Sequence, residues 1–372
     1  MDRRDFMKVS AAASGLGLLQ RRAYGASPVR TAMIGVGGRG SAVLQIILKQ
    51  PDVKVTALCD IKPDRLERGA GVVAAAGERP ATFADYRELL ARDDVDAVFI
   101  DTPCDLHVEM ALAAIAAKKH IYCEKPAGIT PESIGRLTKA VRASDRVFCI
   151  GQQMRSYAGL KPVVKALRDG IAGDILMVKA QRHAGQDIDH NGTSKDWFFD
   201  AKRSGDVINE QSVHNLDVCN WLIGARPESA CGSGGTLLWK NDPPGRTNMD
   251  GYTLSYEYTN GVRLSYTNVF FHPSGLPGGG SYYYVYGTRG SVDVLGGKFY
   301  PREGKGQPEA ITESVGASDD PHVVAFFEAV RTNGKAPADI EIGATAALTA
   351  ILGREAIYRK TVLRWGDLGV EV

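Results

Sequence analysis

The sequence lacks several features that would point to particular classes of protein. None of its 6 cysteines stands in a C-x-x-C pair or at a spacing typical of a zinc site. After the first 26 residues, no apolar stretch approaches the length of a membrane span. The chain has no internal repeat, and its formal net charge is only +2 over 372 residues. The lack of a basic surplus argues against a nucleic-acid-binding protein.

The first 26 residues differ from the rest. Residues 2–8 contain a twin-arginine pair, residues 9–19 form a mild apolar run, and small residues precede Ala26. This pattern predicts a twin-arginine signal peptide over 1–26, export of the folded protein to the periplasm or another extracytoplasmic compartment, and no membrane anchor after signal removal. The alternative is an arginine-rich start of a cytoplasmic protein. Residues 1–26 hold five basic and two acidic residues, a charge of +3, so the remainder carries 2 − 3 = −1.

A glycine-rich turn lies near the start of the remaining chain. It follows an apolar stretch at 31–34 and precedes a helical pattern at 41–48. Gly35, Gly37 and Gly40 fit G-x-G-x-x-G, in which the glycines allow a tight turn, a close approach of pyrophosphate and close helix packing. The intervening Gly38 and Arg39 belong to the same candidate site. Alone the pattern is weak, because a glycine turn also serves packing.

The next expected strand strengthens this interpretation. Val53–Cys59 is apolar, and Asp60 stands at its end, 20 residues after Gly40. A carboxylate there accepts hydrogen bonds from the ribose hydroxyls of a dinucleotide and repels the 2′-phosphate of NADP. Lys62 and Arg65 nearby leave NADP open. The sequence predicts a tightly held nicotinamide cofactor with NAD preferred; alternatively, Asp60 only caps the next helix.

Strands and helices alternate through residues 27–150. Strands are expected at 31–34, Val53–Cys59, 96–101, His120–Cys123 and 147–150, and helices at 41–48, 63–76, 86–91, 107–118 and 131–143. This spacing predicts an α/β domain with a doubly wound parallel sheet. The loops that follow the strands would then share one edge of the sheet, beside the cofactor.

The pattern changes after residue 150. Strands are expected at 175–182, 252–258, 262–268 and 282–286, with a hairpin turn at Asn260-Gly261, and helices at 207–222, 321–331 and 345–359. We therefore expect an α+β domain with a large, mainly antiparallel sheet over 151–342. The C-terminal helix and tail, residues 343–372, are expected to return toward the first domain. The cysteines are expected to be buried free thiols, and no metal site is predicted.

The segment from 99 to 130 carries the first chemical signature. Thr102, Pro103 and His107 follow one expected strand, and Glu124 and Lys125 follow the next, directly before Pro126. A lysine at the cofactor edge can donate a hydrogen bond to a substrate hydroxyl and lower its pKa. The alternative is an exposed lysine paired with Glu124.

In this order, the glycine turn, Asp60, Thr102-Pro103, His107, Glu124-Lys125-Pro126 and a later His-x-x-Asp resemble the glucose–fructose oxidoreductase / inositol dehydrogenase (Gfo/Idh/MocA) family. The resemblance covers nearly all of the chain after the signal. It implies a Rossmann domain plus an open-faced α+β domain, a homodimer or homotetramer formed through that sheet, and NAD or NADP. It also implies a carbohydrate or polyol substrate, and Lys125 as a catalytic or positioning lysine.

The second chemical signature is Glu210 followed four residues later by His214. On a helix these residues share a face. A neutral His214 can accept the proton of a substrate hydroxyl while the hydride leaves the carbinol carbon. Glu210 would orient His214 or bind a second hydroxyl. The family usually has aspartate there, which puts the substrate geometry in doubt. The alternative for His214 is a histidine facing the core.

Four further residues are candidates for substrate binding: Arg155, Tyr157, His183 and Trp197. Arg155 and Tyr157 follow the last strand of the first domain, although Arg155 also suits a surface charge. His183 begins a polar cluster with Asp187, Asp189 and His190, which we expect to be a substrate loop rather than a metal site. Trp197 offers a flat apolar face for a sugar ring, or a core anchor.

Three functions fit these observations. The first is an exported NAD(P)-dependent oxidoreductase acting on a hydroxyl of a sugar, glycoside or polyol, with Lys125, His214 and Glu210 at the reaction. The second is a redox-assisted glycosidase or epimerase that uses transient oxidation without net redox change. The third is a sugar-binding protein without catalysis, against which Lys125 and His214 count.

Overall fold

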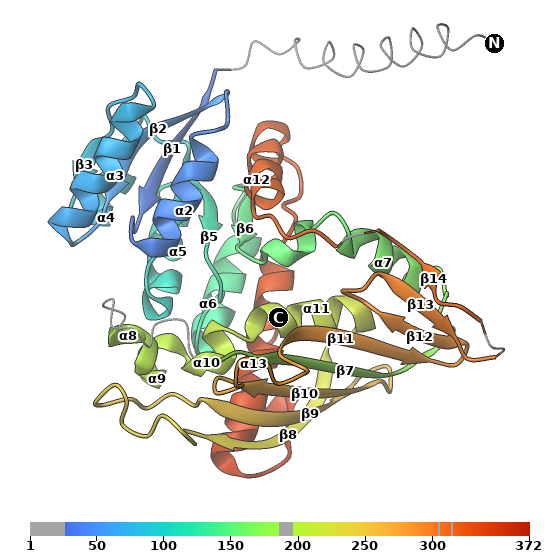
Figure 1. Cartoon of the computed structure of the whole chain (residues 1–372). Helices are drawn as coiled ribbons and strands as arrows, with labels where there is room; N and C mark the ends of the chain where they lie inside the picture. The colour runs from blue at the N-terminus through green and yellow to red at the C-terminus, as the bar shows by residue number, and fades with distance from the viewer. Residues whose placement is uncertain (1–26, 186–195, 304–305, 314) are drawn as a thin grey trace, which may run out of the picture.

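The computed structural model describes residues 27–185, 196–303, 306–313 and 315–372. The expected signal at 1–26 and the residues Asp187, Asp189 and His190 of the expected substrate loop lie outside the described residues. Figure 1 shows two sheets, with the smaller one at the N-terminal end of the described chain and the larger one beneath it. Helices lie between and around them.

The first domain contains a parallel six-stranded sheet in the order β3-β2-β1-β4-β5-β6. Its strands are β1 Val29–Ile34, β2 Val53–Cys59, β3 Ala81–Phe83, β4 Ala97–Ile100, β5 His120–Cys123 and β6 Phe148–Ile150. Its helices are α2 Gly38–Ile47, α3 Pro63–Ala75, α4 Tyr86–Leu90, α5 His107–Ala116 and α6 Pro131–Arg142, with the 3₁₀ turn η1 at Cys104–Leu106. All four residues of β4 are buried, as expected for a strand covered on both faces. The predicted doubly wound sheet is confirmed; only β3 is an unexpected strand.

The second domain contains a nine-stranded sheet in the order β14-β13-β12-β11-β7-β10-β9-β8-β15. Its strands are β7 Ile175–His183, β8 Pro227–Gly235, β9 Gly251–Tyr258, β10 Arg263–Val269, β11 Gly280–Gly287, β12 Gly290–Asp293, β13 Lys298–Pro301, β14 Glu309–Ala310 and β15 Leu363–Arg364. All neighbours are antiparallel except β7 and β10. Alternate residues of β9 are buried and exposed, so one face packs on helices and the other is open. This confirms the expected open, mainly antiparallel sheet.

Short helices cover the inner face of this sheet and link the domains. They are η2 Gln153–Ser156, α7 Leu160–Arg168, α8 Asp196–Phe199, α9 Ala201–Ser204, α10 Asp206–Glu210 and α11 Val213–Ile223. The expected single helix over 207–222 is wrong, because the helix is interrupted at residues 211–212, between α10 and α11. Ser212, at this break, accepts a hydrogen bond from the Tyr266 hydroxyl at 2.9 Å and also bonds Tyr252. These buried hydrogen bonds hold the interruption in place. The sequence has no glycine or proline there that would have predicted it.

Helix α12, Asp320–Thr332, corrects the expected domain boundary. We expected residues 151–342 to form the second domain, but α12 packs on the first sheet. Phe326 meets Phe99 of β4 edge to face, with ring centroids 5.3 Å apart. Figure 1 shows α12 beside the parallel sheet, far in sequence from the strands that it covers. The apolar face of α12 therefore belongs to the core of the first domain.

Helix α13, Ile340–Arg359, spans both domains. It packs against α6 and β6 of the first domain and against α11 and β8 of the second. At its start, a Cβ on Gly343 would meet Cγ1 of Ile150 at 2.5 Å. Further along, Nη1 of Arg354 donates to the carbonyl oxygens of Ile129 at 3.1 Å and Gly205 at 3.0 Å. The helix therefore contacts both domains, and the tail adds β15 and the turn η3 (Trp365–Leu368) beside β8 of the second sheet. Near its end the tail also reaches the first domain, where a Cβ on Gly135 of α6 would lie 2.7 Å from Cγ2 of Val370.

The cysteines are free, as expected, and five of the six are buried; Cys231 is exposed. Within the described ranges, no helix has the length and apolar character needed to cross a bilayer. The same part of the chain holds no cluster of three or more His, Cys, Asp or Glu side chains suited to a metal ion.

Candidate active site

A cavity of about 1300 Å³ lies where the two domains meet. On one side it is lined by the residues that follow β1, β2, β4 and β5, which share the carboxyl edge of the parallel sheet. On the other side it is lined by α10, α11, β7 and β11 of the second domain. Ligands of doubly wound folds bind at this edge. The topology therefore brings most of the predicted residues to one cavity.

The glycine turn has the geometry that a dinucleotide needs. Gly35 has φ +91°, and a Cβ there would meet the carbonyl oxygen of Asp101 at 2.5 Å. A Cβ on Gly40 would lie 2.0 Å from the carbonyl oxygen of Gly35, so the helix packs tightly on the turn. Gly37 and Gly38 line the cavity at the start of α2, whose first turn has no acidic side chain. The free N–H groups of this turn suit an anionic pyrophosphate.

Asp60 is held at the end of β2 with its carboxylate at the cavity. Its Oδ2 accepts the backbone N–H of Val36 at 3.0 Å, and its Oδ1 accepts that of Lys62 at 2.9 Å. The side chain is 8% exposed. Each oxygen keeps a lone pair for a further donor. This carboxylate fits ribose hydroxyls, and with the glycine turn it makes the residues present suitable for a nicotinamide dinucleotide.

Arg39 and Glu124 form an ion pair beside the glycine turn. Nε of Arg39 lies 2.8 Å from Oε1 of Glu124, and its Nη1 lies 2.7 Å from Oδ2 of Asp319. Burial acts to lower the pKa of Arg39, but the charge of Glu124 and the hydrogen bonds to Glu124 and Asp319 together raise it. The guanidinium therefore stays cationic and ties α2 to the end of β5 and the start of α12.

Asp101 follows β4 in the same region, and the sequence analysis missed it. Neither of its carboxyl oxygens has a hydrogen-bond partner among the described residues. Burial raises its pKa well above the ordinary value, and the charge of Glu124 adds to this, whereas Arg39 opposes it. The raised pKa favours the protonated form of Asp101 next to the glycine turn. Its place directly after a buried parallel strand, like that of Asp60, was the signal available in the sequence.

Thr102, Pro103 and His107 lie after β4, as expected, and line the cavity. The two ring nitrogens of His107 each lie 2.9 Å from a backbone oxygen, Nδ1 from that of Pro126 and Nε2 from that of Thr102. Burial lowers the pKa of His107. This histidine therefore connects the loop after β4 to the loop that carries Lys125, and it acts as a positioning residue.

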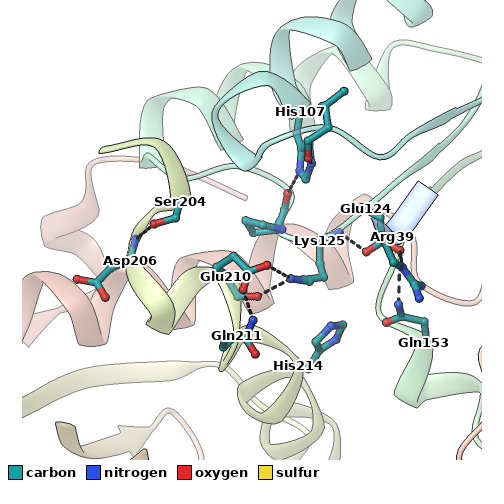
Figure 2. A network of polar contacts seen from close by, with 12 residues as sticks. Arg39, His107, Glu124, Lys125, Gln153, Ser204, Asp206, Glu210, Gln211 and His214 are labelled. Atoms are coloured by element: carbon teal, nitrogen blue, oxygen red, sulfur yellow. Dashed lines mark hydrogen bonds and ion pairs between the residues drawn. The ribbon is translucent and has the colours of Figure 1, made fainter. Parts of the chain in front are cut away.

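Lys125 reaches across the cavity to α10. Its Nζ lies 2.9 Å from Oε1 of Glu210 and also donates to the backbone oxygen of Glu210 (Figure 2). The two side chains are 13% and 10% exposed. Burial acts to lower the pKa of Lys125, but the charge of Glu210, its hydrogen bond and other nearby negative groups together raise it. Lys125 is therefore a fixed ammonium donor and not a base.

His214 projects from the first turn of α11 into the same region (Figure 2). Its Nδ1 lies 3.0 Å from Oε1 of Gln152, an atom that only accepts hydrogen bonds, so Nδ1 carries the proton and the Nε2 lone pair is free. Burial lowers the pKa of His214 well below its ordinary value, and the charges of Lys125, Arg39 and Arg182 add to this effect. The imidazole is neutral near pH 7 and suited to act as a base.

The expected orienting role of Glu210 is corrected. Because the helix breaks at Ser212, Glu210 and His214 do not share a regular helical face. The carboxylate of Glu210 bonds Lys125 and Gln211, whereas Gln152 orients His214. Gln152 follows β6 by two residues and was not singled out in the sequence.

The four expected substrate residues separate into two groups. Tyr157 and Trp197 line the cavity. Arg155 does not: its Nη2 lies 2.8 Å from Oδ1 of Asp217, and this pair is nearly buried. His183 lies instead in a second hollow of about 450 Å³, where its Nε2 is 2.9 Å from Oγ1 of Thr267. For Arg155 and His183, the expectation of a place in this cavity is therefore wrong.

The prediction for His183 failed because its side chain lies on the opposite face of β7 from the cavity. Successive side chains of a strand point to opposite faces of a sheet, and in β7 it is Arg182 that lines the cavity. Nη2 of Arg182 donates to Oε1 of Gln211 at 2.9 Å. Asn215 and Ser281 line the cavity nearby and were also missed. Polar residues alternate with apolar ones along such strands, so nothing in the sequence distinguished the polar residues that face the cavity from those that face solvent.

Two family models match the chain. "Oxidoreductase family, NAD-binding Rossmann fold" matches residues 29–152, and "GFO/IDH/MocA C-terminal domain" matches residues 161–293. The chain belongs to the Gfo/Idh/MocA family. Its first domain is the NAD-binding Rossmann domain of that family, in agreement with the glycine turn and Asp60.

Individual relatives share different parts of the chain. A "Glycosyl hydrolase family 109 protein" of Saccharopolyspora erythraea is 37% identical over 154 residues, which are 40% of this chain and 33% of that protein. "Uncharacterized oxidoreductase YrbE" of Bacillus subtilis is 24% identical over 346 residues, which are 88% of this chain and 94% of that protein. The match thus spans a third of the first relative and nearly all of the second.

Among solved structures of the same fold is "Levoglucosan dehydrogenase, complex with NADH and levoglucosan". It is 18% identical, has a TM-score of 0.78, and covers 91% of this chain and 99% of its own. At this identity the likeness shows the fold alone. The Gfo/Idh/MocA architecture is therefore shared over nearly the whole described chain.

Proposed function

We propose that this protein oxidises a hydroxyl group of a sugar, glycoside or polyol with a tightly held NAD. The observation that carries the proposal is the convergence of His214, a neutral base, and Lys125, a fixed ammonium donor, at the cavity that holds the glycine turn. The solved structure of levoglucosan dehydrogenase, which has the same fold, is a complex with NADH and levoglucosan. A binding protein has no need of a base and an acid at one point.

In the forward direction the substrate loses a proton from its hydroxyl oxygen and a hydride from the carbon that bears this hydroxyl, which gives a carbonyl. NAD, when bound, accepts the hydride. Nε2 of His214 takes the hydroxyl proton, and the Nδ1–H bond to Gln152 keeps the ring in the tautomer that leaves Nε2 free. Lys125 donates to the substrate oxygen as negative charge develops on it. Glu210 holds the ammonium in place.

NAD rather than NADP follows from Asp60. Its carboxylate lines the cavity and accepts two backbone N–H groups, which holds it toward the adenosine ribose, where it would repel a 2′-phosphate. Lys62 and Arg65 also line this region, and they are the residues through which NADP would be accepted.

A redox-neutral reaction is the second candidate. The glycosyl hydrolase family 109 relative is 37% identical over 154 residues, which favours a glycosidase or epimerase in which the sugar is oxidised transiently and reduced again. The same base and donor serve both reactions. Net formation of NADH from a free sugar supports the dehydrogenase, and cleavage of a glycoside without net NADH supports the alternative.

The test begins with the cofactor. The protein is purified without added nucleotide and denatured, and any released nucleotide is identified by mass. Stoichiometric NAD(H) is expected, whereas NADP(H) would overturn the interpretation of Asp60. Sugars, polyols and glycosides are then screened by the absorbance of reduced nicotinamide and by chromatography of the products. If the protein neither releases nor binds a nicotinamide nucleotide, both redox proposals fail.

We further propose export by the twin-arginine route, on the basis of the arginine pair and apolar run within residues 1–26. Such a route carries folded proteins, so a cofactor bound in the cytoplasm would travel with the enzyme. The full chain and a variant with both arginines of the pair changed to lysine are compared in cell fractions. The full chain is expected outside the cytoplasm and the variant inside it.

Self-association through the open sheet is part of the same proposal. Met177, Tyr286 and Tyr300 lie in one cross-strand row over β7, β11 and β13, and are 40%, 37% and 44% exposed. Tyr282 and Tyr284, both on β11, stack on each other with ring centroids 4.7 Å apart. An apolar face of this kind suits contact with a second copy. Light scattering is expected to give a dimer or tetramer, and Tyr286→Asp is expected to shift it toward the monomer.

A further inference from the structure

Three neighbouring strands place a polar row on the inner face of the large sheet. Arg182 of β7 stands between Asn268 of β10 and Ser281 of β11, to which it is directly paired in register. Arg182 and Ser281 line the cavity. Oγ of Ser281 accepts a hydrogen bond at 3.3 Å from Nδ2 of Asn215, which also lines it. Arg182, Ser281 and Asn215 therefore lie on the side of the cavity that the second domain forms, whereas Asn268 lines the second hollow.

The charges of the side chains connected to Arg182 do not balance. Arg182, Gln211, Glu210 and Lys125 form a continuous chain of contacts. Within this chain Lys125 is compensated by the carboxylate of Glu210, but Arg182 donates to the neutral amide oxygen of Gln211. Nε of Arg182 is buried and has no partner among the described residues. These four connected residues therefore include two cations and one anion, so one positive charge among them is left without a carboxylate partner.

An uncompensated guanidinium in a partly buried site is costly unless an anion joins it. Arg39, near the nucleotide end, has its own carboxylates in Glu124 and Asp319. Arg203 also lines the cavity, but its Nε lies 3.0 Å from Oδ2 of Asp105. Arg182 thus differs from both in lacking a carboxylate partner within the described chain.

We infer that Arg182 is a specificity residue that binds a carboxylate of the substrate, and that the enzyme acts on acidic sugars, uronic or aldonic, rather than on their neutral counterparts. This inference rests on the proposed oxidoreductase function, since it assigns the substrate of that cavity. A guanidinium suits a carboxylate because its N–H groups make charge-assisted hydrogen bonds. Ser281 is paired with Arg182, and Asn215 donates to Ser281; both line the cavity and offer partners for the hydroxyls next to the carboxylate.

The test compares acids with neutral analogues of the same shape. D-glucuronate is paired with D-glucuronamide, and D-galacturonate and D-gluconate with their amides. Binding to the NAD-loaded protein is measured by calorimetry, and turnover by the formation of NADH. Arg182→Met removes the charge, Arg182→Lys keeps it, and Arg203→Met is the matched control, since Arg203 lines the cavity but is already paired.

The acid of at least one pair is expected to bind at least about tenfold more tightly than its amide, as a charge-assisted hydrogen bond predicts. Arg182→Met is expected to abolish this selectivity, mainly through KM, and Arg182→Lys to restore part of it; Arg203→Met keeps the selectivity. Equal binding of acids and amides, selectivity that survives Arg182→Met, or no binding of any acid overturns the inference. If acids bind selectively but no compound is oxidised, the oxidoreductase proposal fails while the binding role of Arg182 stands.

Discussion

Oε1 of Gln152 accepts the Nδ1–H of His214 at 3.0 Å, and this bond decides which ring nitrogen is free to take a proton. Gln152 is 1% exposed and His214 is partly buried, so water does not replace the partner easily. The amide acts through the imidazole rather than on the substrate, so Gln152 is a positioning residue.

Replacing Gln152 separates this role from a structural one. Gln152→Leu is expected to lower kcat by about tenfold or more, less than the roughly 10²–10⁴-fold contribution of a general base, while the affinity for NAD changes little. Gln152→Glu is expected to raise the pKa of His214, because a carboxylate stabilises the imidazolium. The acid limb of the kcat/KM profile then moves to higher pH. An unmoved limb with unchanged kcat would contradict the assignment.

Removing the ammonium of Lys125 is expected to suppress turnover without loss of nucleotide. Lys125→Met leaves Glu210 buried without its cation, so the double variant Lys125→Met/Glu210→Gln is the better probe. We expect kcat to fall by roughly 10²–10⁴-fold in the double variant, as for loss of a hydrogen-bond donor to a developing alkoxide. Released NAD(H) and the melting temperature report whether the fold and the cofactor site survive. A double variant with full activity would show that Lys125 does not assist the reaction.

The pH profile of kcat/KM follows from the two shifted groups. Burial and nearby cations lower the pKa of His214, and the base must be neutral, so activity is lost only as pH falls through this lowered pKa. The charge of Glu210, acting against burial, raises the pKa of Lys125, which therefore remains protonated through alkaline pH. We expect a plateau that extends at least from about pH 6.5 to about pH 10, the ordinary His and Lys values. An acid limb centred above the ordinary histidine pKa would argue against His214 as the base.

Asp101 links protein stability to pH. Burial, with the charge of Glu124, raises the folded pKa of Asp101 above its unfolded value. Its contribution to stability is therefore complete below the unfolded pKa and is lost as pH rises through the folded pKa. Asp101→Asn keeps the shape without ionising, so its stability relative to wild type rises with pH in that window, by at most about 1.4 kcal/mol per pH unit. Thermal unfolding of both proteins across this range is the measurement, and parallel curves would show that Asp101 is ionised in the folded protein.

The sequence predicted the first domain well because its elements depend on local pattern. Buried parallel strands such as β4 are short continuous apolar runs, and helical patterns alternate with them along the chain. The residues after these strands then had to meet at one edge, which placed Asp60 and Lys125 correctly without any knowledge of side-chain contacts. Asp101 occupied an equivalent position but matched no expected chemistry.

The second domain was predicted less completely because its site depends on tertiary contacts. The break between α10 and α11 is fixed by hydroxyl bonds from strands distant in sequence, at Ser212. The choice between Arg182 and His183 depends on which face of β7 meets the helices, and a single residue of register reverses it. Likewise, no local pattern indicates that Asp217 binds Arg155 away from the cavity.

Helix α13 has a consequence for how the enzyme moves. Gly343 packs against Ile150 of the first domain, and Arg354 holds carbonyl groups of both Ile129 and Gly205. A hinge rotation that separated the two domains would have to break these contacts together, so we expect the cleft to keep its width. The same continuity makes the two domains one cooperative folding unit, and calorimetry should record a single unfolding transition rather than one for each domain.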